Sequence, residues 1–165
     1  TIQHDLIAAL KTLLSEYKAT QAAEGEKLFN IISERLKAIT QIVNDAIPLL
    51  DNLIDDYKER SKQRLIEAIG ESNVSDTRLQ QEFAFFCQKV DIHEEMDRLS
   101  AHVAEFTKLL NKGGAIGKRL DFICQEMHRE ANTFGSKSIS IHTTQKSVDL
   151  KVLIEQIREQ VQNIM

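Results

Sequence analysis

The longest regular feature of the sequence is an apolar seam between residues 28 and 57. Its members are spaced alternately about four and three residues apart: Leu28, Ile32, Leu36, Ile39, Val43, Ala46, Leu50, Leu53 and Tyr57. This spacing keeps one face of an α-helix apolar over many turns and is typical of a coiled coil. Pro48 lies inside the seam and removes one backbone hydrogen bond, so we expect a kink there. A seam of this length usually packs on another chain, which predicts an oligomer.

Apolar residues also recur with a helical period in five other stretches, which we expect to be helices. These stretches are 3–19, 77–89, 92–111, 118–134 and 147–163. Asp91, with Glu94 three residues later, has the form of a capping box and predicts a break before the third of them. The glycines of KGGAIG (112–117) separate the third stretch from the fourth, and GSKSISIHTTQ (135–145) reads as a linker.

The composition supports an all-α fold. The chain has one Pro, six Gly and no Trp among 165 residues, with abundant residues that favour helices. We therefore predict antiparallel helical hairpins with a long, kinked, coiled-coil-like arm. Residues 1–75 would form the arm, and residues 76–165 a C-terminal helical domain.

Charge and apolar content exclude several classes of protein. The formal net charge of −4 provides no general attraction for nucleic acid or an anionic membrane. No apolar run approaches the roughly 20 residues needed to span a bilayer. The opening TIQHDLIAAL lacks the features of a signal peptide and an initiator Met, so we expect part of a longer cytoplasmic protein. Cys87 and Cys124 have no zinc-ligand spacing and are expected to be reduced core residues.

The stretch 91–110 carries a polar stripe opposite its apolar positions. Asp91, Glu95, Arg98, His102 and Glu105 fall within about 80° on a helical wheel. Carboxylates and an imidazole along one line can hold a divalent metal or act as acid and base. An exposed face with ion pairs, such as Glu94 with Arg98, explains the same pattern.

The stretch 118–137 has an unusual number of polar groups for a helix with only one wet face. Its apolar stripe is Leu120, Ile123, Met127, Ala131 and Phe134. One polar line consists of Asp121, Gln125, Arg129, Asn132 and Ser136, and a second of Glu126, Glu130, Thr133 and Lys137. Such a helix can contact a core, solvent and a further partner, although the polar residues near its end could also only fray it.

Acids and bases are also segregated between these two stretches. Five acids and one arginine occupy 91–105, whereas five bases and three acids occupy 112–137. Pairing of the two helices as a hairpin would bring an acidic, histidine-bearing surface beside a basic one. This arrangement suits metal-assisted cleavage of a phosphodiester, and it equally suits a hairpin held by salt bridges between its helices.

Four blocks of the sequence resemble, in order, those of the YicC family of bacterial proteins. The blocks are EGEKL, DIHEEMDRLSAH, GKRLDFICQEMHREANTFGSKS and IEQIREQVQNI. The resemblance covers essentially the whole chain, which would be the C-terminal part of a protein about twice as long. One departure is His128, where we expect Asn or another polar residue.

The resemblance implies a metal-dependent endoribonuclease of the bacterial cytoplasm that prefers single-stranded RNA and assembles as a hexamer. Within the second and third blocks it points to Asp91, Glu94, Glu95, Arg98, His102, Asp121, Gln125, Glu126, Arg129, Glu130, Asn132 and Thr133. Their individual roles are our own assignment. As catalytic residues we predict Glu95, His102, Glu126, Arg129 and Glu130. As ligands of Mn²⁺ or Mg²⁺ we predict Asp91, Glu95, His102 and Glu126. As RNA-binding residues we predict Arg98, Lys118, Arg119, Arg129, Asn132 and Lys137.

Two other functions fit the same residues. A non-catalytic adaptor would bind RNA and present it to another nuclease. A structural module would use its long arm to build an oligomer, a trimer or a hexamer. We expect RNA and further copies of the chain as partners, and neither a membrane nor DNA.

Overall fold

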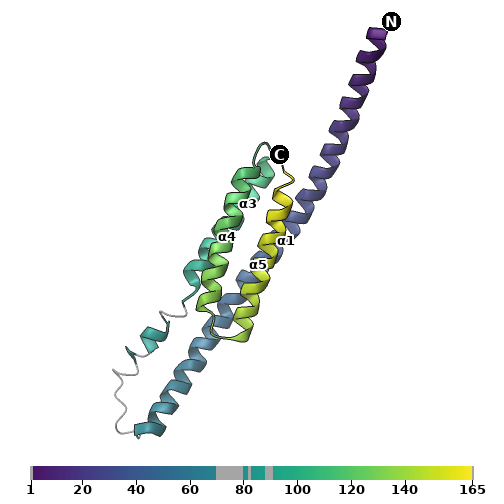
Figure 1. Cartoon of the computed structure of the whole chain (residues 1–165). Coiled ribbons are helices and arrows are strands. Elements are labelled where there is room, and N and C mark those ends of the chain that lie inside the picture. Colours follow the sequence, from purple (N-terminus) through teal and green to yellow (C-terminus); the bar gives the residue numbers. More distant parts are fainter. Residues whose placement is uncertain (1, 70–79, 82, 88–90, 165) are drawn as a thin grey trace.

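The computed structural model describes residues 2–69, 80–81, 83–87 and 91–164. All regular structure among these residues is helical, as the composition predicts (Figure 1). Residues 80–81 and 83–87 are helical and agree with the helix expected over 77–89, whose other residues lie outside the described part. The loop expected at 70–76 also lies outside it.

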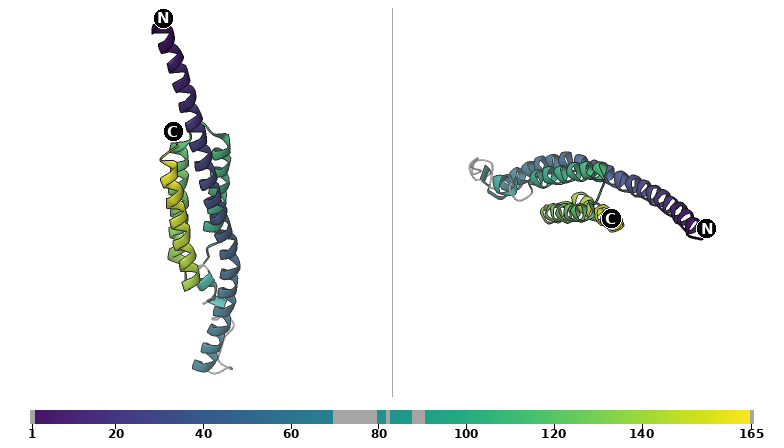
Figure 2. Two further views of the ribbon diagram at one scale, coloured as in Figure 1. Left: turned by 90° about the vertical axis from the view of Figure 1, so that its right-hand side faces the viewer. Right: turned by 90° about the horizontal axis from the view of Figure 1, so that it is seen from above.

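Helix α1 (Ile2–Ile69) runs for 68 residues without interruption. At 1.5 Å per residue it is about 100 Å long. Gly25 lies inside it, and so does Pro48, beyond which the helix continues. Figure 2 shows that α1 curves along its length. The two stretches expected at 3–19 and 28–57 therefore belong to one helix.

Helices α3 (His93–Lys112) and α4 (Gly117–Lys137) form an antiparallel hairpin. Before α3, the Asp91 side chain accepts a hydrogen bond of 3.0 Å from the backbone N–H of His93. The expected break occurs there, but the capping box with Glu94 does not form. Gly113 and Gly114 join the helices with φ of 67° and 88°, a left-handed conformation that L side chains rarely adopt.

Helix α5 (Ile141–Val161) follows α4 after only three residues. The long linker expected over 135–145 is therefore wrong at both ends. The Ser140 side chain accepts from the backbone N–H of Thr143, and Thr143 Oγ1 accepts from the backbone N–H of Ser140. This capping box uses Thr rather than the Glu or Gln of the usual pattern. The start of α5 could therefore not be recognised from the usual sequence pattern.

The middle of α1 packs with α3, α4 and α5 into a four-helix bundle, in which α1 contacts α3 and α5, and α4 contacts α3 and α5 (Figures 1 and 2). The core stripes expected on α4 and α5 are buried. From α1 the core receives Ile32, Leu36, Ile39, Val43 and Ala46. Helices of the same chain therefore cover these residues. The expectation that the seam packs on another chain is wrong for this part of it.

The first quarter of α1 extends beyond the bundle (Figure 1). Its apolar residues are exposed on the single chain: Ile2, Leu6, Ile7, Leu10, Leu13, Leu14 and Tyr17. Cys87 and Cys124 are free thiols, and burial raises the pKa of the Cys124 thiol to about 12. Within the described ranges, no helix has the length and apolar character needed to cross a bilayer.

Candidate functional site

Charged side chains of α3 and α4 pair along one edge of their hairpin. We call this edge the charged flank; its members are Glu95, Arg98, His102 and Glu105 on α3 and Arg119, Glu126, Glu130 and Lys137 on α4. Three ion pairs cross between the helices: Lys137–Glu95 at 2.9 Å, Arg98–Glu130 at 3.8 Å and Arg119–Glu105 at 2.8 Å. The structure therefore confirms that the acidic and basic helices bring their polar edges together.

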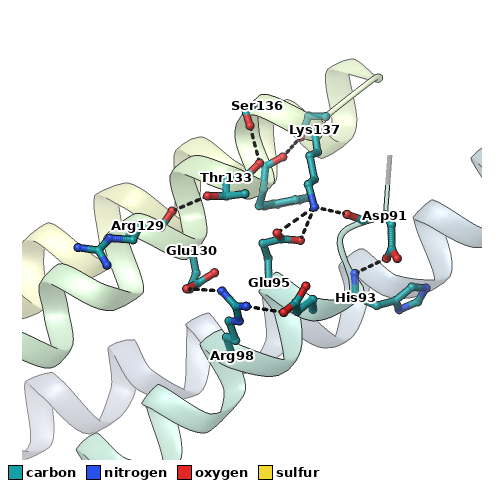
Figure 3. A network of polar contacts seen from close by, with 12 residues as sticks. Asp91, His93, Glu95, Arg98, Arg129, Glu130, Thr133, Ser136 and Lys137 are labelled. Carbon is teal, nitrogen blue, oxygen red and sulfur yellow. Dashed lines mark hydrogen bonds and ion pairs between the residues drawn. The ribbon is translucent and has the colours of Figure 1, made fainter. Parts of the chain in front are cut away.

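The most enclosed contact of the charged flank joins the end of α4 to the start of α3 (Figure 3). The Lys137 ammonium group donates to both carboxylate oxygens of Glu95, at 2.9 and 3.1 Å, and to the backbone carbonyl of Asp91, at 2.8 Å. Only 8% of the Glu95 side chain is exposed. These three acceptors match the three N–H groups of lysine. Lys137 thus holds the hairpin together and has little left to offer RNA in the single chain.

Arg98 bridges two carboxylates in the next part of the charged flank (Figure 3). It binds Glu94 one turn away on α3 and Glu130 across the hairpin. The hydrogen bond that Arg98 donates to Glu94 is the main cause that raises the pKa of Arg98. Glu130 is almost completely buried, whereas Arg98 remains more than half exposed. The guanidinium group can therefore still reach an anion from solvent.

His102 and Glu126 occupy the open part of the charged flank, and Arg129 lies beside Glu126. His102 follows Arg98 by one helical turn, and Glu126 precedes Glu130 by one turn, so the two lie at the same level of the antiparallel hairpin. Both are half-buried. Arg129 donates to Glu126 at 3.2 Å and its side chain is 71% exposed. His102 therefore shares a level of the hairpin with Glu126, whose carboxylate is paired with the exposed guanidinium group of Arg129.

The four residues expected to hold a metal do not gather in one chain. Glu95 and His102 are seven residues apart on α3, or about 10.5 Å along the helix axis. Glu95 is bound by Lys137, and Asp91 accepts from His93 at the start of α3. Across the described ranges, no group of three His, Cys, Asp or Glu side chains could hold a metal ion. The helical wheel brought these residues together because it shows angle and hides the distance along the axis.

The other expected site residues are spread over the surface of α4. Lys118 is exposed in its first turn, and Arg119 pairs with Glu105. Asn132 is exposed and its amide lies 3.0 Å from Nδ1 of His128. The Thr133 hydroxyl donates to the backbone carbonyl of Arg129 one turn earlier in the same helix. The RNA-binding prediction for these residues stays a prediction.

Asp121 faces the other neighbour of α4, helix α5. Asp121 accepts a hydrogen bond of 2.9 Å from Arg158 of α5, and Gln125 donates to the same carboxylate at 2.8 Å. The bond from Arg158 lowers the pKa of Asp121 and raises that of Arg158. Sequence reasoning did not identify Arg158, although a basic residue late in α5 could have been matched to Asp121 from antiparallel packing.

Ser147 is a buried polar residue that the sequence analysis also missed. Its hydroxyl donates to the backbone carbonyl of Ala131 at 3.0 Å. A Cβ atom at Gly135 would lie 2.5 Å from the Ser147 oxygen, so only glycine fits without a shift. This contact sets the position of the last turn of α4, from which Lys137 reaches Glu95.

Known proteins resemble this chain in sequence over nearly its whole length. The sequence model of a family described as "Endoribonuclease YicC-like, C-terminal" matches residues 48–165. The chain belongs to this family. The "Probable endoribonuclease YicC" of Haemophilus influenzae is 43% identical over 163 residues, which are 99% of this chain and 56% of that protein. The protein of the same name from Clostridioides difficile is 34% identical over 157 residues, which are 94% of this chain and 54% of that protein.

The YicC-like region thus includes α3, α4 and α5 and the last third of α1. The chain spans about half the length of the curated relatives it matches. The charged flank lies wholly inside the matched region.

Proposed function

We propose that this chain is the part of a YicC-type endoribonuclease that carries the cleavage site, and that the site lies on the charged flank. The observation that carries the proposal is the level that His102 shares with the Glu126–Arg129 pair, one turn from the buried carboxylate of Glu130. The names of the relatives support RNA as the substrate. Single-stranded RNA fits a surface site because its backbone can lie along a helix without a deep groove.

The buried and exposed members would have different tasks. Glu95 and Glu130 are each bound to a cation and almost fully buried, so they position the hairpin and need not contact RNA. Arg98 and Arg129 are exposed enough to bind a phosphate and stabilise the negative charge that develops during cleavage. His102 would take the proton from the oxygen that attacks the phosphorus, with Glu126 orienting the imidazole. The bond from phosphorus to the leaving oxygen breaks, and that oxygen takes a proton from water.

We also propose that cleavage requires Mn²⁺ or Mg²⁺. The described residues of one chain do not fit such an ion, so its ligands would include groups from another copy or from the remainder of the longer protein. Exposed carboxylates near the charged flank, such as Glu94 and Asp97, favour a hard cation of this kind.

We also propose that the protein forms an oligomer, a trimer or a hexamer, because apolar residues at the start of α1 are exposed on the single chain. Leu6, Leu10, Leu13 and Tyr17 are each more than half exposed and lie on one side of the helix. Contact with another copy would remove this apolar surface from water. Light scattering of the full-length protein tests the proposal, since Leu10→Asp with Leu13→Asp should lower the mass and Lys18→Asp should not.

Cleavage of a labelled single-stranded RNA by the full-length protein tests the enzymatic function. We expect His102→Ala to lower the rate about 100-fold or more, the usual contribution of acid–base catalysis. His142→Ala is the matched control, because His142 is exposed on α5 away from the charged flank. A His102→Ala protein that cleaves at the parent rate would contradict the assignment.

The same assay separates the alternatives. RNA cleavage that continues in the presence of a chelator would contradict the proposed metal requirement and leave the nuclease assignment intact. Salt-sensitive RNA binding without cleavage by the purified protein would favour the adaptor. An oligomer with no affinity for RNA would leave the structural module.

A further inference from the structure

Helix α4 has a surface that the charged flank does not include. We call it the outer face of α4; its members are Lys118, Phe122, Gln125, Arg129, Thr133 and Ser136. At 100° per residue these six positions fall within about 80° of one another, opposite the core stripe of the helix. All are exposed except Thr133, which is half-buried. This face lies between the sides of α4 that contact α3 and α5.

Phe122 is the unusual member of this face. Its side chain is 59% exposed, and it is the one large apolar side chain on α3 or α4 that is exposed within the part of the chain described here. A core or a typical protein interface would place further apolar residues around it. Its neighbours on the face are instead a lysine, an arginine, an amide and hydroxyl groups. An aromatic ring among cations and hydrogen-bonding groups is typical of a surface that binds single-stranded nucleic acid.

The charges of α4 are compatible with this partner. The outer face contains Lys118 and Arg129 and no carboxylate. The three acids of the helix flank the face, and each is paired with a cation: Asp121 with Arg158, Glu126 with Arg129 and Glu130 with Arg98. Arg129 uses its Nη1 for Glu126 and keeps other N–H donors that can bind a phosphate.

We propose that the outer face of α4 is a track for single-stranded RNA and that a base stacks on Phe122. The inference rests on the proposed function and extends it, because it names how the substrate is held. Phe122 precedes Arg129 by seven residues, or about 10.5 Å along the axis. A strand whose base stacks on Phe122 therefore places a following phosphate beside Arg129, at the level of Glu126 and His102. Stacking on a ring accepts any base, so this contact gives affinity without sequence preference.

The first test measures binding of a 2′-O-methyl oligouridylate to the full-length protein by fluorescence anisotropy. Phe122→Ala should weaken binding about 5- to 150-fold, the usual effect of removing one stacking platform. Phe122→Leu should weaken binding by the same factor, because leucine is apolar but has no ring. Phe122→Tyr should bind RNA as tightly as the parent. The slope of log K against the logarithm of the salt concentration should be unchanged in Phe122→Ala. In Arg129→Ala it should fall by about the amount expected for one lost phosphate contact.

The second test uses tryptophan fluorescence, since this chain has no Trp of its own. RNA should quench the added signal of Phe122→Trp, because the indole stacks on a base. Val152→Trp is the matched control: Val152 is half exposed on α5, outside the track, and its signal should not change. This pair retains the test even if Phe122→Ala folds poorly.

The outcomes separate this inference from the proposed function. If the parent binds and cleaves RNA while Phe122→Ala binds equally well and Phe122→Trp is not quenched, the track is wrong and the nuclease stands. If Phe122→Ala lowers the mass of the oligomer without weakening RNA binding, Phe122 belongs to a protein interface and the track is wrong. If the parent neither binds nor cleaves RNA, both proposals fail.

Discussion

The two ends of the α3–α4 hairpin carry the same kind of contact in different surroundings. At one end, Lys137 binds Glu95 with side-chain exposures of 30% and 8%; at the other, Arg119 binds Glu105 with exposures of 65% and 45%. The distances are nearly equal, at 2.9 and 2.8 Å. Sequence spacing alone cannot distinguish them.

Burial, not distance, therefore decides how much an ion pair contributes to the stability of the fold. Water and salt screen the exposed pair, which should stabilise the fold by about 0–1 kcal/mol. In the buried pair, loss of one partner leaves a charge that water cannot fully solvate. The buried end is therefore expected to hold the geometry of the charged flank, and the exposed end to be replaceable.

The largest effect should come from breaking the buried pair. Glu95→Ala leaves the Lys137 ammonium group with the Asp91 carbonyl alone, and we expect a loss of about 2–3 kcal/mol in the free energy of unfolding. Urea denaturation measures it, with Glu94→Ala as the control because its carboxylate is 68% exposed. Equal losses for the two variants would show that burial does not separate the pairs.

A smaller effect is expected at the middle of the hairpin. Arg98→Ala removes the cation 3.8 Å from the buried Glu130 carboxylate, and we expect a loss of about 1–2 kcal/mol. Adding Glu130→Gln to Arg98→Ala should restore part of the loss, because no buried charge then remains. If the double variant is less stable than Arg98→Ala, the carboxylate has another partner that matters more.

Loss of the ion pair at the exposed end should have almost no effect on stability. Arg119→Ala should change the free energy of unfolding by about 0–0.5 kcal/mol, and high salt should abolish the difference. Thermal unfolding at low and high salt provides the measurement. A salt-independent loss above 1 kcal/mol would place this pair with the buried one.

The smallest effect concerns Asp121, which pairs with Arg158 on the α5 side. Because Arg158 lowers the pKa of Asp121 in the folded state, the pair stabilises the fold above the ordinary carboxyl pKa. That contribution disappears as the pH falls through the lowered pKa. The stability difference between the parent and Arg158→Gln should therefore shrink from about pH 5 to about pH 3. A difference that grows toward acid would reverse the sign and contradict this contact.

Much of the fold could be predicted from periodicity. The core stripes of α4 and α5 are buried as expected, since a 3.6-residue repeat specifies which side of a helix is apolar. The start of α5 was missed because Ser140 and Thr143 form a capping box outside the usual pattern. Of the polar residues singled out, Arg98 pairs with Glu130 and Lys137 with Glu95 across the hairpin, whereas the four expected metal ligands do not gather at one place.

By itself, the sequence determined that the chain is helical, which side of each helix is apolar, and, through its characteristic blocks, which family it belongs to. Only the tertiary structure decided what covers each apolar side. On α1, Ile32 and Ile39 are buried by the same chain, whereas Leu6 and Leu13 remain exposed, although all four belong to apolar stretches with a helical period. The reason is that helical periodicity is a local property, whereas burial depends on which other helix lies at the same level along the axis.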